Sequence, residues 1–138
     1  MSFCRIVGYD IICVVETWPN TEVLASELQI HGYIMYRLDR EHKSGGGLVL
    51  YVKDDFQSSL CMSLMNSGFE ESLWCTLLKF RIVFLIGLCY RCPSSTSEND
   101  NLLLSLLDTV SMQVNVSHVM IMGDFNFPDI DFVTGEVF

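Results

Sequence analysis

Five side chains suited to phosphate chemistry stand at the ends of apolar stretches of this sequence. They are Glu16, Tyr90, Arg91, Asp124 and Asn126. If those stretches are neighbouring strands, all five side chains can meet at one edge of a sheet. Carboxylates beside a phenol suit a hard cation such as Mg²⁺ or Mn²⁺, and Mg²⁺ takes one or two carboxylates and keeps water and phosphate oxygens at its other positions. The pattern therefore predicts metal-assisted phosphoryl chemistry.

Each of these residues has an expected role in such chemistry. Glu16 would hold the metal ion, and Asp124 would orient or deprotonate the attacking water. Asn126 would fix that carboxylate or a phosphate oxygen, while Tyr90 and Arg91 would donate hydrogen bonds to the phosphate. These roles require three stretches that are far apart in the sequence to come together in the fold.

Asp124 and Asn126 are two residues apart, directly after the apolar run 119–122. In an extended chain they would point the same way, while Phe125 and Phe127 would face the packed side. The run itself is predicted to be a buried strand. Aspartate and asparagine also open turns, so the alternative that they only begin the turn at 128–129 stays open here.

The charge balance argues against a surface built for broad attraction to nucleic acid. Eight cationic and 17 anionic residues give a formal charge of −9. A local basic loop nevertheless contains Arg37, Arg40 and Lys43. It could contact DNA phosphates, and the alternative is a solvated hairpin tip.

The six cysteines are scattered, and most lie inside apolar runs, where cysteine behaves as a small buried hydrophobe. Cys89 and Cys92 have the spacing of a redox or zinc half-site, but no second pair accompanies them. We therefore expect neither a disulfide framework nor a zinc site.

The elements that must position these residues are predicted from apolar patterning and turn signals. A chain of 138 residues predicts one domain, 1–138, with a real core. Strands are expected at 11–15, 33–38, 48–52, 56–64, 71–78, 81–89 and 119–122, with 11–15 buried on both faces and 56–64 at an edge. Helices are expected at 23–28 and from Ser97 to Val110, with Ser97 and Asp100 forming a capping box. This order of strands and helices indicates an α/β or α+β layered domain.

No apolar run approaches the ~18 residues that a membrane helix requires. The run at 11–15 lies between Asp10 and Glu16, which is unlike the apolar core of a secretory signal. The sequence therefore predicts an intracellular protein, nuclear or cytoplasmic, without membrane association.

Four blocks of the sequence, in order, resemble the endonuclease/exonuclease/phosphatase superfamily, and most closely the apurinic-type endonuclease domain of non-LTR (LINE-like) retrotransposons. The blocks are Asp-Ile-Ile-Cys-Val-Val-Glu-Thr-Trp at 10–18, Gly-Gly-Gly-Leu-Val-Leu-Tyr-Val at 45–52, Tyr-Arg-Cys-Pro-Ser-Ser at 90–95 and Gly-Asp-Phe-Asn-Phe-Pro-Asp-Ile at 123–130. The resemblance spans about Tyr9 to Phe132. It implies a DNase I-like two-sheet sandwich flanked by helices, and Mg²⁺-dependent phosphodiester hydrolysis with DNA nicking as the retroelement role.

Matched block by block, Glu16 corresponds to the metal-binding glutamate of the family and Tyr90 to its active-site tyrosine. Asp124 and Asn126 correspond to the residues that handle the attacking water and the phosphate. Arg91 lies in a matching block with a less certain role.

The sequence also departs from the family pattern. Residues 1–8 contain no counterpart of the asparagine on the family's first strand, and no Ser-Asp-His block follows residue 130. Cys92 stands where the family usually has proline. We therefore expect an incomplete domain with weak or absent activity, whose uncovered sheet edges could self-associate.

Two alternatives to a DNA-nicking enzyme remain. One is a non-catalytic remnant that binds metal, DNA or protein, and it is motivated by the absent histidine block. The other is a lipid or inositol phosphate phosphodiesterase of the same superfamily.

Overall fold

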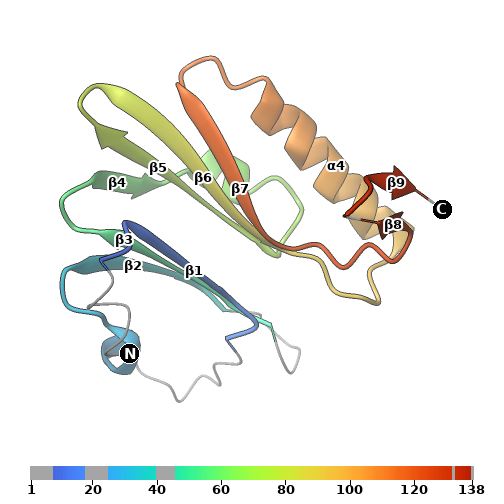
Figure 1. The fold of residues 1–138 in the computed structure, drawn as a ribbon, viewed down its shortest axis with the longest axis horizontal. Helices are drawn as coiled ribbons and strands as arrows, with labels where there is room; N and C mark the ends of the chain where they lie inside the picture. Colours follow the sequence, from blue (N-terminus) through green and yellow to red (C-terminus); the bar gives the residue numbers. More distant parts are fainter. Residues whose placement is uncertain (1–7, 18–24, 40–45, 132, 138) are drawn as a thin grey trace.

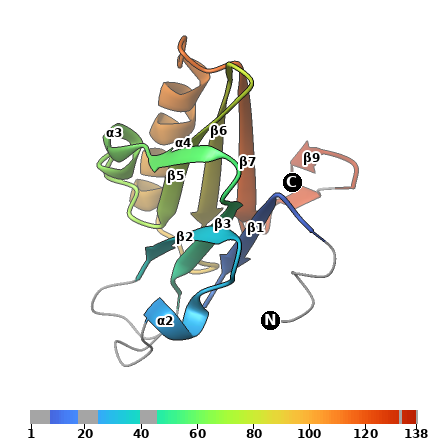
Figure 2. The ribbon, with the colours of Figure 1, turned by 90° about the vertical axis from the view of Figure 1, so that its left-hand side faces the viewer.

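The computed structural model describes residues 8–17, 25–39, 46–131 and 133–137, which form two facing sheets with helices outside them (Figures 1 and 2). The elements are β1 (Ile11–Val15), α2 (Ala25–Leu28), β2 (Tyr33–Leu38), β3 (Leu48–Lys53), β4 (Gln57–Leu60), α3 (Met62–Met65), β5 (Ser72–Lys79), β6 (Ile82–Tyr90), α4 (Ser97–Ser111), β7 (His118–Asp124), β8 (Ile130–Asp131) and β9 (Glu136–Val137). The expected α/β layered fold with two sheets is confirmed.

The smaller of the two facing sheets is antiparallel, with strand order β1-β3-β2. The larger sheet has the order β4-β5-β6-β7. Its last pair, β6 and β7, is parallel, and α4 forms the crossover between them, as parallel neighbours require. Parallel pairing places the carboxyl ends of β6 and β7 at the same edge, with Tyr90 opposite Asp124.

The main core fills the space between the two sheets. Its buried side chains come from β3, β5 and β6, and they are Leu48, Leu50, Val52, Leu73, Cys75, Leu77, Ile86, Leu88 and Tyr90. Alternate residues of each strand point into this layer, because successive side chains of a strand face opposite sides. The core thus reaches Tyr90, at the end of β6 where the polar residues begin.

A second core lies between the outer face of the larger sheet and α4. Leu103, Leu106 and Val110 of α4 are buried there against Trp74 of β5 and Leu85 of β6. The apolar spacing of this helix was predicted, and it fixes α4 along the sheet (Figure 1). The N-terminus of α4 is thereby placed close to the end of β6.

Gly87 of β6 lies directly against the indole ring of Trp74. A Cβ at position 87 would come within 2.3 Å of the ring atom Cζ3, and Trp74 is fully buried. We expect Gly87→Ala to lower the free energy of unfolding by about 2 kcal/mol, because the ring has no free space into which to move. Urea denaturation measures this change. In a Trp74→Leu background the same substitution should cost less, and an equal cost in both backgrounds would contradict the packing explanation.

Two predicted elements are more exposed than expected. β1 and β7 are edge strands of their sheets. Val14 is 37% exposed, so β1 is not buried on both faces, and Val119 and Met120 of β7 are 43% and 51% exposed. Apolar composition predicted these strands correctly but could not show that each lacks a neighbour on one side. Self-association through these edges stays a prediction.

Three other boundaries differ from expectation. The stretch 56–64 forms the short edge strand β4 and then turns into α3. The predicted helix 23–28 is described only as α2, since residues before 25 lie outside the described part. The N-cap of α4 is Thr96, whose side chain accepts a hydrogen bond from the Asn99 backbone, so the capping box predicted at Ser97 is wrong by one residue. Within the described ranges, no helix is long and apolar enough to cross a membrane.

Candidate active site

A hydrogen bond between Glu16 and Tyr90 joins the two sheets at the predicted edge. Glu16 directly follows β1 of the smaller sheet, and Tyr90 ends β6 of the larger one. The Tyr90 hydroxyl donates to Glu16 Oε1 at 2.5 Å. Glu16 has φ of +52°, an uncommon conformation for a residue other than glycine, and its side chain is exposed while Tyr90 is buried. The expectation that these two distant residues meet is borne out by this contact.

The environment of Tyr90 keeps its phenol protonated. The hydrogen bond to Glu16 is the largest cause, followed by burial and the negative charge of Glu16, and together they raise the pKa of Tyr90 to about 12. A neutral phenol at this position can act as a hydrogen-bond donor throughout the physiological range. It cannot act as a base there.

The Tyr90 contact predicts an alkaline titration that depends on Glu16. The chain contains five tyrosines, so the absorbance titration of wild type minus that of Tyr90→Phe isolates this phenol. We expect a midpoint near 12, which falls toward the ordinary value of about 10 in Glu16→Gln. Circular dichroism at each pH verifies that the chain stays folded. An unchanged midpoint in Glu16→Gln would show that the hydrogen bond does not set the pKa.

Asp124 ends β7 next to Tyr90. The two residues are opposite each other in the parallel register, and the Arg91 backbone N–H donates to the Asp124 carbonyl at 2.8 Å. Among the described residues, the Asp124 carboxylate has no hydrogen-bond partner, whereas Asp131 accepts from the N–H groups of Val133 and Thr134. The turn at 128–129 is closed instead by the Ile130 backbone N–H, which lies 3.5 Å from the Phe127 carbonyl, and Asp131 serves the turn that follows it. This contrast favours a chemical role for Asp124.

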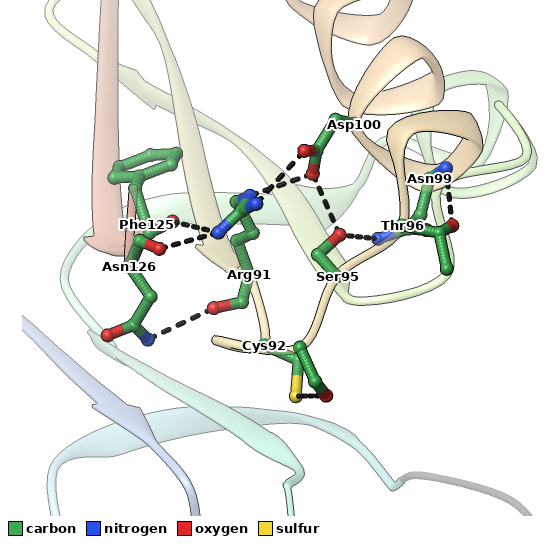
Figure 3. Close-up of polar contacts among 9 residues, drawn as sticks. Arg91, Cys92, Ser95, Thr96, Asn99, Asp100, Phe125 and Asn126 are labelled. Atoms are coloured by element: carbon green, nitrogen blue, oxygen red, sulfur yellow. Dashed lines mark hydrogen bonds and ion pairs between the residues drawn. The ribbon is translucent and has the colours of Figure 1, made fainter. Parts of the chain in front are cut away.

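Asn126 does not continue the extended chain, contrary to expectation. Its φ is +44°, so the alternation of side chains along β7 ends before it. Its amide nitrogen donates to the Arg91 carbonyl at 3.0 Å, and the amide oxygen points the other way (Figure 3). Phe125 and Phe127 do pack against the second core, as predicted.

A shallow pocket of about 430 Å³ lies beside these residues. Its lining residues are Pro93, Asp124, Asn126, Phe127, Pro128 and Ile130. Aspartate and asparagine therefore border one hollow next to the ends of β6 and β7. The pocket could accept a small phosphate-bearing group.

Arg91 is 5% exposed and is bound on several sides by protein groups. It pairs with Asp100 of α4 and donates to the backbone carbonyl of Asn126 (Figure 3). Its predicted contact with substrate phosphate stays a prediction. Sequence reasoning missed Asp100 as its partner, because it placed Asp100 in a helix cap.

The basic loop and the cysteine pair contribute less to this edge. Arg37 lies in β2, and its Nε is 2.5 Å from Asp39 Oδ1. Arg40 and Lys43 lie outside the described residues. Cys89 is buried within β6 and Cys92 Sγ lies 3.1 Å from Ser94 Oγ, so they form no disulfide with each other.

Comparison with known proteins decides the family. The profile of the endonuclease/exonuclease/phosphatase family matches residues 2–134 of this chain. The chain belongs to this family. A search of curated protein sequences finds no match.

Solved structures of the family share the fold. The endonuclease domain of TRAS1, a telomere-specific non-LTR retrotransposon, matches with a TM-score of 0.66 at 10% identity over 91% of this chain and 50% of that one. The human Nocturnin catalytic domain matches with 0.61 at 19% identity over 96% and 57%. D. rerio TDP2 complexed with a single-strand DNA product matches with 0.58 at 13% identity over 93% and 52%. At these identities the likeness establishes the DNase I-like fold alone, and this chain spans about half the length of the structures that it matches.

Family members typically use a divalent metal ion, and the oxygen donors at this edge decide whether one fits here. Within the described ranges, no group of three or more histidine, cysteine, aspartate or glutamate side chains could hold a metal. Mg²⁺ commonly uses only one or two protein carboxylates together with water and phosphate. The exposed carboxylate of Glu16, directed at the phenol of Tyr90, fits such an open site.

Neither described histidine lies at this edge. His118 begins β7, at the strand end opposite Asp124. His31 precedes β2, whose first residue, Tyr33, pairs with Lys53 at the end of β3 that is remote from Glu16. The described residues of this family member therefore offer no imidazole for proton transfer here.

Tyr90 itself lines a larger groove of about 670 Å³. Its lining includes the carboxylates of Asp39, Glu70, Glu71 and Glu98. This concentration of negative charge would repel phosphate. The smaller pocket, which Tyr90 does not line, carries the carboxylate of Asp124 alone.

Proposed function

We propose that this chain carries a Mg²⁺-dependent phosphodiesterase site that nicks DNA, in the manner of a retrotransposon endonuclease. The observation that supports this most strongly is that Glu16 and Tyr90 meet beside the strand end that carries Asp124. Glu16 accepts a hydrogen bond from Tyr90, and Tyr90 lies opposite Asp124 in the sheet register. Family membership supplies the reaction class.

The proposed reaction is attack of water on the phosphorus with cleavage of a phosphorus–oxygen bond of the backbone. Asp124 accepts a proton from the attacking water. The single phenol hydrogen of Tyr90 is donated to Glu16, so Tyr90 would donate to the phosphate only once a bound metal ion takes over Glu16. Asn126 would fix the Asp124 carboxylate or a phosphate oxygen through the second hydrogen of its amide nitrogen, since the first is donated to the Arg91 carbonyl. Glu16 would hold Mg²⁺ or Mn²⁺, which when bound neutralises charge on the phosphate oxygens.

In the proposed reaction the leaving oxygen takes its proton from solvent, because His31 and His118, the histidines of the described ranges, lie away from this edge. A missing general acid costs ~10²–10⁴ in rate. We therefore propose weak nicking for these 138 residues acting alone. We also propose that Arg91 contacts the phosphate and that Arg37, Arg40 and Lys43 contact DNA.

DNA is the proposed substrate because of the relatives rather than the overall charge. TRAS1 is an endonuclease of a retrotransposon, and the TDP2 structure holds a DNA product. The formal charge of −9 predicts that binding is local, confined to the edge and the basic loop. A nuclear or cytoplasmic location accompanies this proposal.

Conversion of supercoiled plasmid to open circles tests the proposal, because one nick per molecule is detected. We expect nicking that requires Mg²⁺ or Mn²⁺ and stops with a chelator. The same preparation is given phosphatidylinositol bisphosphate vesicles and soluble inositol phosphates. Faster hydrolysis of those substrates would favour the lipid or inositol phosphodiesterase. No metal-dependent turnover of any substrate would favour the non-catalytic remnant.

A further inference from the structure

A partly buried ion pair connects α4 to the residue that follows Tyr90. Arg91 Nε lies 2.7 Å from Asp100 Oδ1, and Arg91 Nη2 lies 2.9 Å from Asp100 Oδ2. The side chains of Arg91 and Asp100 are 6% and 23% exposed. A two-pronged pair of this kind fixes the plane of the guanidinium as well as its position. The Ser95 hydroxyl also donates to Asp100 Oδ1 at 2.7 Å, which holds the carboxylate in place.

The opposite side of the same guanidinium holds the chain that follows β7. Arg91 Nη1 donates to the Asn126 carbonyl at 2.5 Å, and the guanidinium lies 4.1 Å from the centre of the Phe127 ring. In return, the Asn126 amide donates to the Arg91 carbonyl. Figure 3 shows Arg91 between Asp100 on one side and Asn126 on the other. One cation therefore joins the N-terminal turn of α4 to the candidate site.

Asn126 needs such support, because its backbone is in an unfavourable conformation. A φ of +44° is uncommon for a residue with a side chain, although asparagine tolerates it better than most. Conformations of this kind persist where surrounding contacts hold them. The contacts to Arg91 are the ones that reach both the backbone and the side chain of Asn126.

We infer that Asp100 is a positioning residue, which holds Asn126 at the candidate site by fixing the Arg91 guanidinium between them. The kinetic part of this inference rests on the proposed function. Each nitrogen of the guanidinium donates to a protein acceptor, and this occupancy suits a positioning role for Arg91. Asp100 contacts neither Asn126 nor the pocket, so its effect passes through Arg91.

Asp100→Asn tests the inference, because it keeps the size of the side chain and removes the charge that orients Arg91. The first readout is the side-chain amide signal of Asn126 in ¹⁵N–¹H spectra, which requires no activity. We expect its position to shift and its hydrogen exchange to become at least about 10-fold faster. Glu98→Gln is the matched control, because it removes an exposed carboxylate from the same first turn of α4 and should leave the signal unchanged.

The second readout is nicking kinetics. A displaced Asn126 should lower kcat about 10-fold to 100-fold and leave KM within about twofold, since a small misplacement penalises the chemical step more than substrate binding. Asp100→Glu should recover part of the loss, because it restores the negative charge. A loss of folding alone would instead reduce the active fraction without changing the Asn126 signal of the folded molecules.

An unchanged Asn126 signal in Asp100→Asn would overturn the inference, and so would an equal change in Glu98→Gln. If Asp100→Asn does not fold, Ser95→Ala provides the test, since it removes one hydrogen bond to Asp100 and should shift the same signal less. If wild type nicks no DNA, the proposed function fails. In that case the side-chain amide signal of Asn126 in Asp100→Asn still tests whether Asp100 positions Asn126.

Discussion

Asp124→Asn is expected to lower the rate of metal-dependent plasmid nicking about 10³-fold. The substitution keeps the shape of the side chain but removes the group that would accept the proton of the attacking water, and loss of a positioned base costs ~10²–10⁴ in rate. Asp124 has no competing structural task among the described residues, so the fold should remain intact. Nicked circles are counted against time for wild type and variant at equal Mg²⁺ and equal salt.

Asp129→Asn is the matched control for that experiment. Asp129 is an exposed carboxylate five residues from Asp124 and does not line the pocket. The Asp129→Asn variant changes the net charge by the same amount as Asp124→Asn. It should nevertheless retain most of the wild-type nicking rate, because Asp129 lies outside the pocket. Equal nicking by Asp124→Asn and wild type would remove Asp124 from the proposed mechanism, or attribute the activity to a contaminant.

Arg91→Met is expected to destabilise the chain by about 2 kcal/mol, less than the ~3–5 kcal/mol for breaking a fully buried ion pair, because the Asp100 side chain is 23% exposed. The change leaves the Asp100 carboxylate and the Asn126 carbonyl without their shared donor. Urea denaturation measures the loss. Arg81→Met, at an exposed arginine of the β5–β6 turn, should cost little. Adding Asp100→Asn to Arg91→Met should recover part of the loss.

The loss of unfolding free energy caused by Arg91→Met should also depend on pH. The hydrogen bonds from Arg91 and Ser95 hold the pKa of Asp100 below its ordinary value. A lowered pKa contributes stability above the pKa of the unfolded chain, near 3.8, and that contribution is lost as the pH falls through the folded value. The difference in the free energy of unfolding between wild type and Arg91→Met should therefore be largest near pH 7 and become smaller below about pH 4. A constant difference down to pH 2 would contradict the assignment of the pair.

Local sequence patterns were sufficient to predict most of the elements. Four leucines and one valine of α4 recur at helical spacing, namely Leu102, Leu103, Leu106, Leu107 and Val110. The β5–β6 hairpin follows from two apolar runs around a tight turn. Phe80 and Arg81 of that turn both have positive φ, as a two-residue hairpin requires. The exposure of side chains was predicted less well. Met120 is an apolar residue and was expected in a buried strand, but its apolar character does not show whether another strand covers it.

The candidate site was predicted only in part, because local patterns show where polar residues follow strands but not which distant residues come into contact. Polar residues at strand ends indicated that Tyr90 and Asp124 would share an edge, and β6 and β7 are indeed parallel neighbours. Glu16 was expected at the same sheet edge, but it follows β1 of the other sheet and reaches Tyr90 across the two sheets. The partnership of Arg91 with Asp100 and Asn126 depends on how α4 crosses the sheet. Residues nine and 35 positions apart leave no periodic signal of such a contact. Asp100 also stood three residues after a serine, which suggested a helix cap instead.

Paramagnetic broadening by Mn²⁺ tests most directly whether residues 16, 90 and 124 form one metal-dependent site. A 15.7 kDa chain gives resolved amide spectra, and the experiment requires no catalytic turnover. At low Mn²⁺ we predict that the amide signals of Glu16, Tyr90 and Asp124 broaden together, and that Glu16→Gln abolishes this effect. First broadening at Glu70 and Glu98 in the acidic groove, with Glu16 and Asp124 unaffected, would contradict the account.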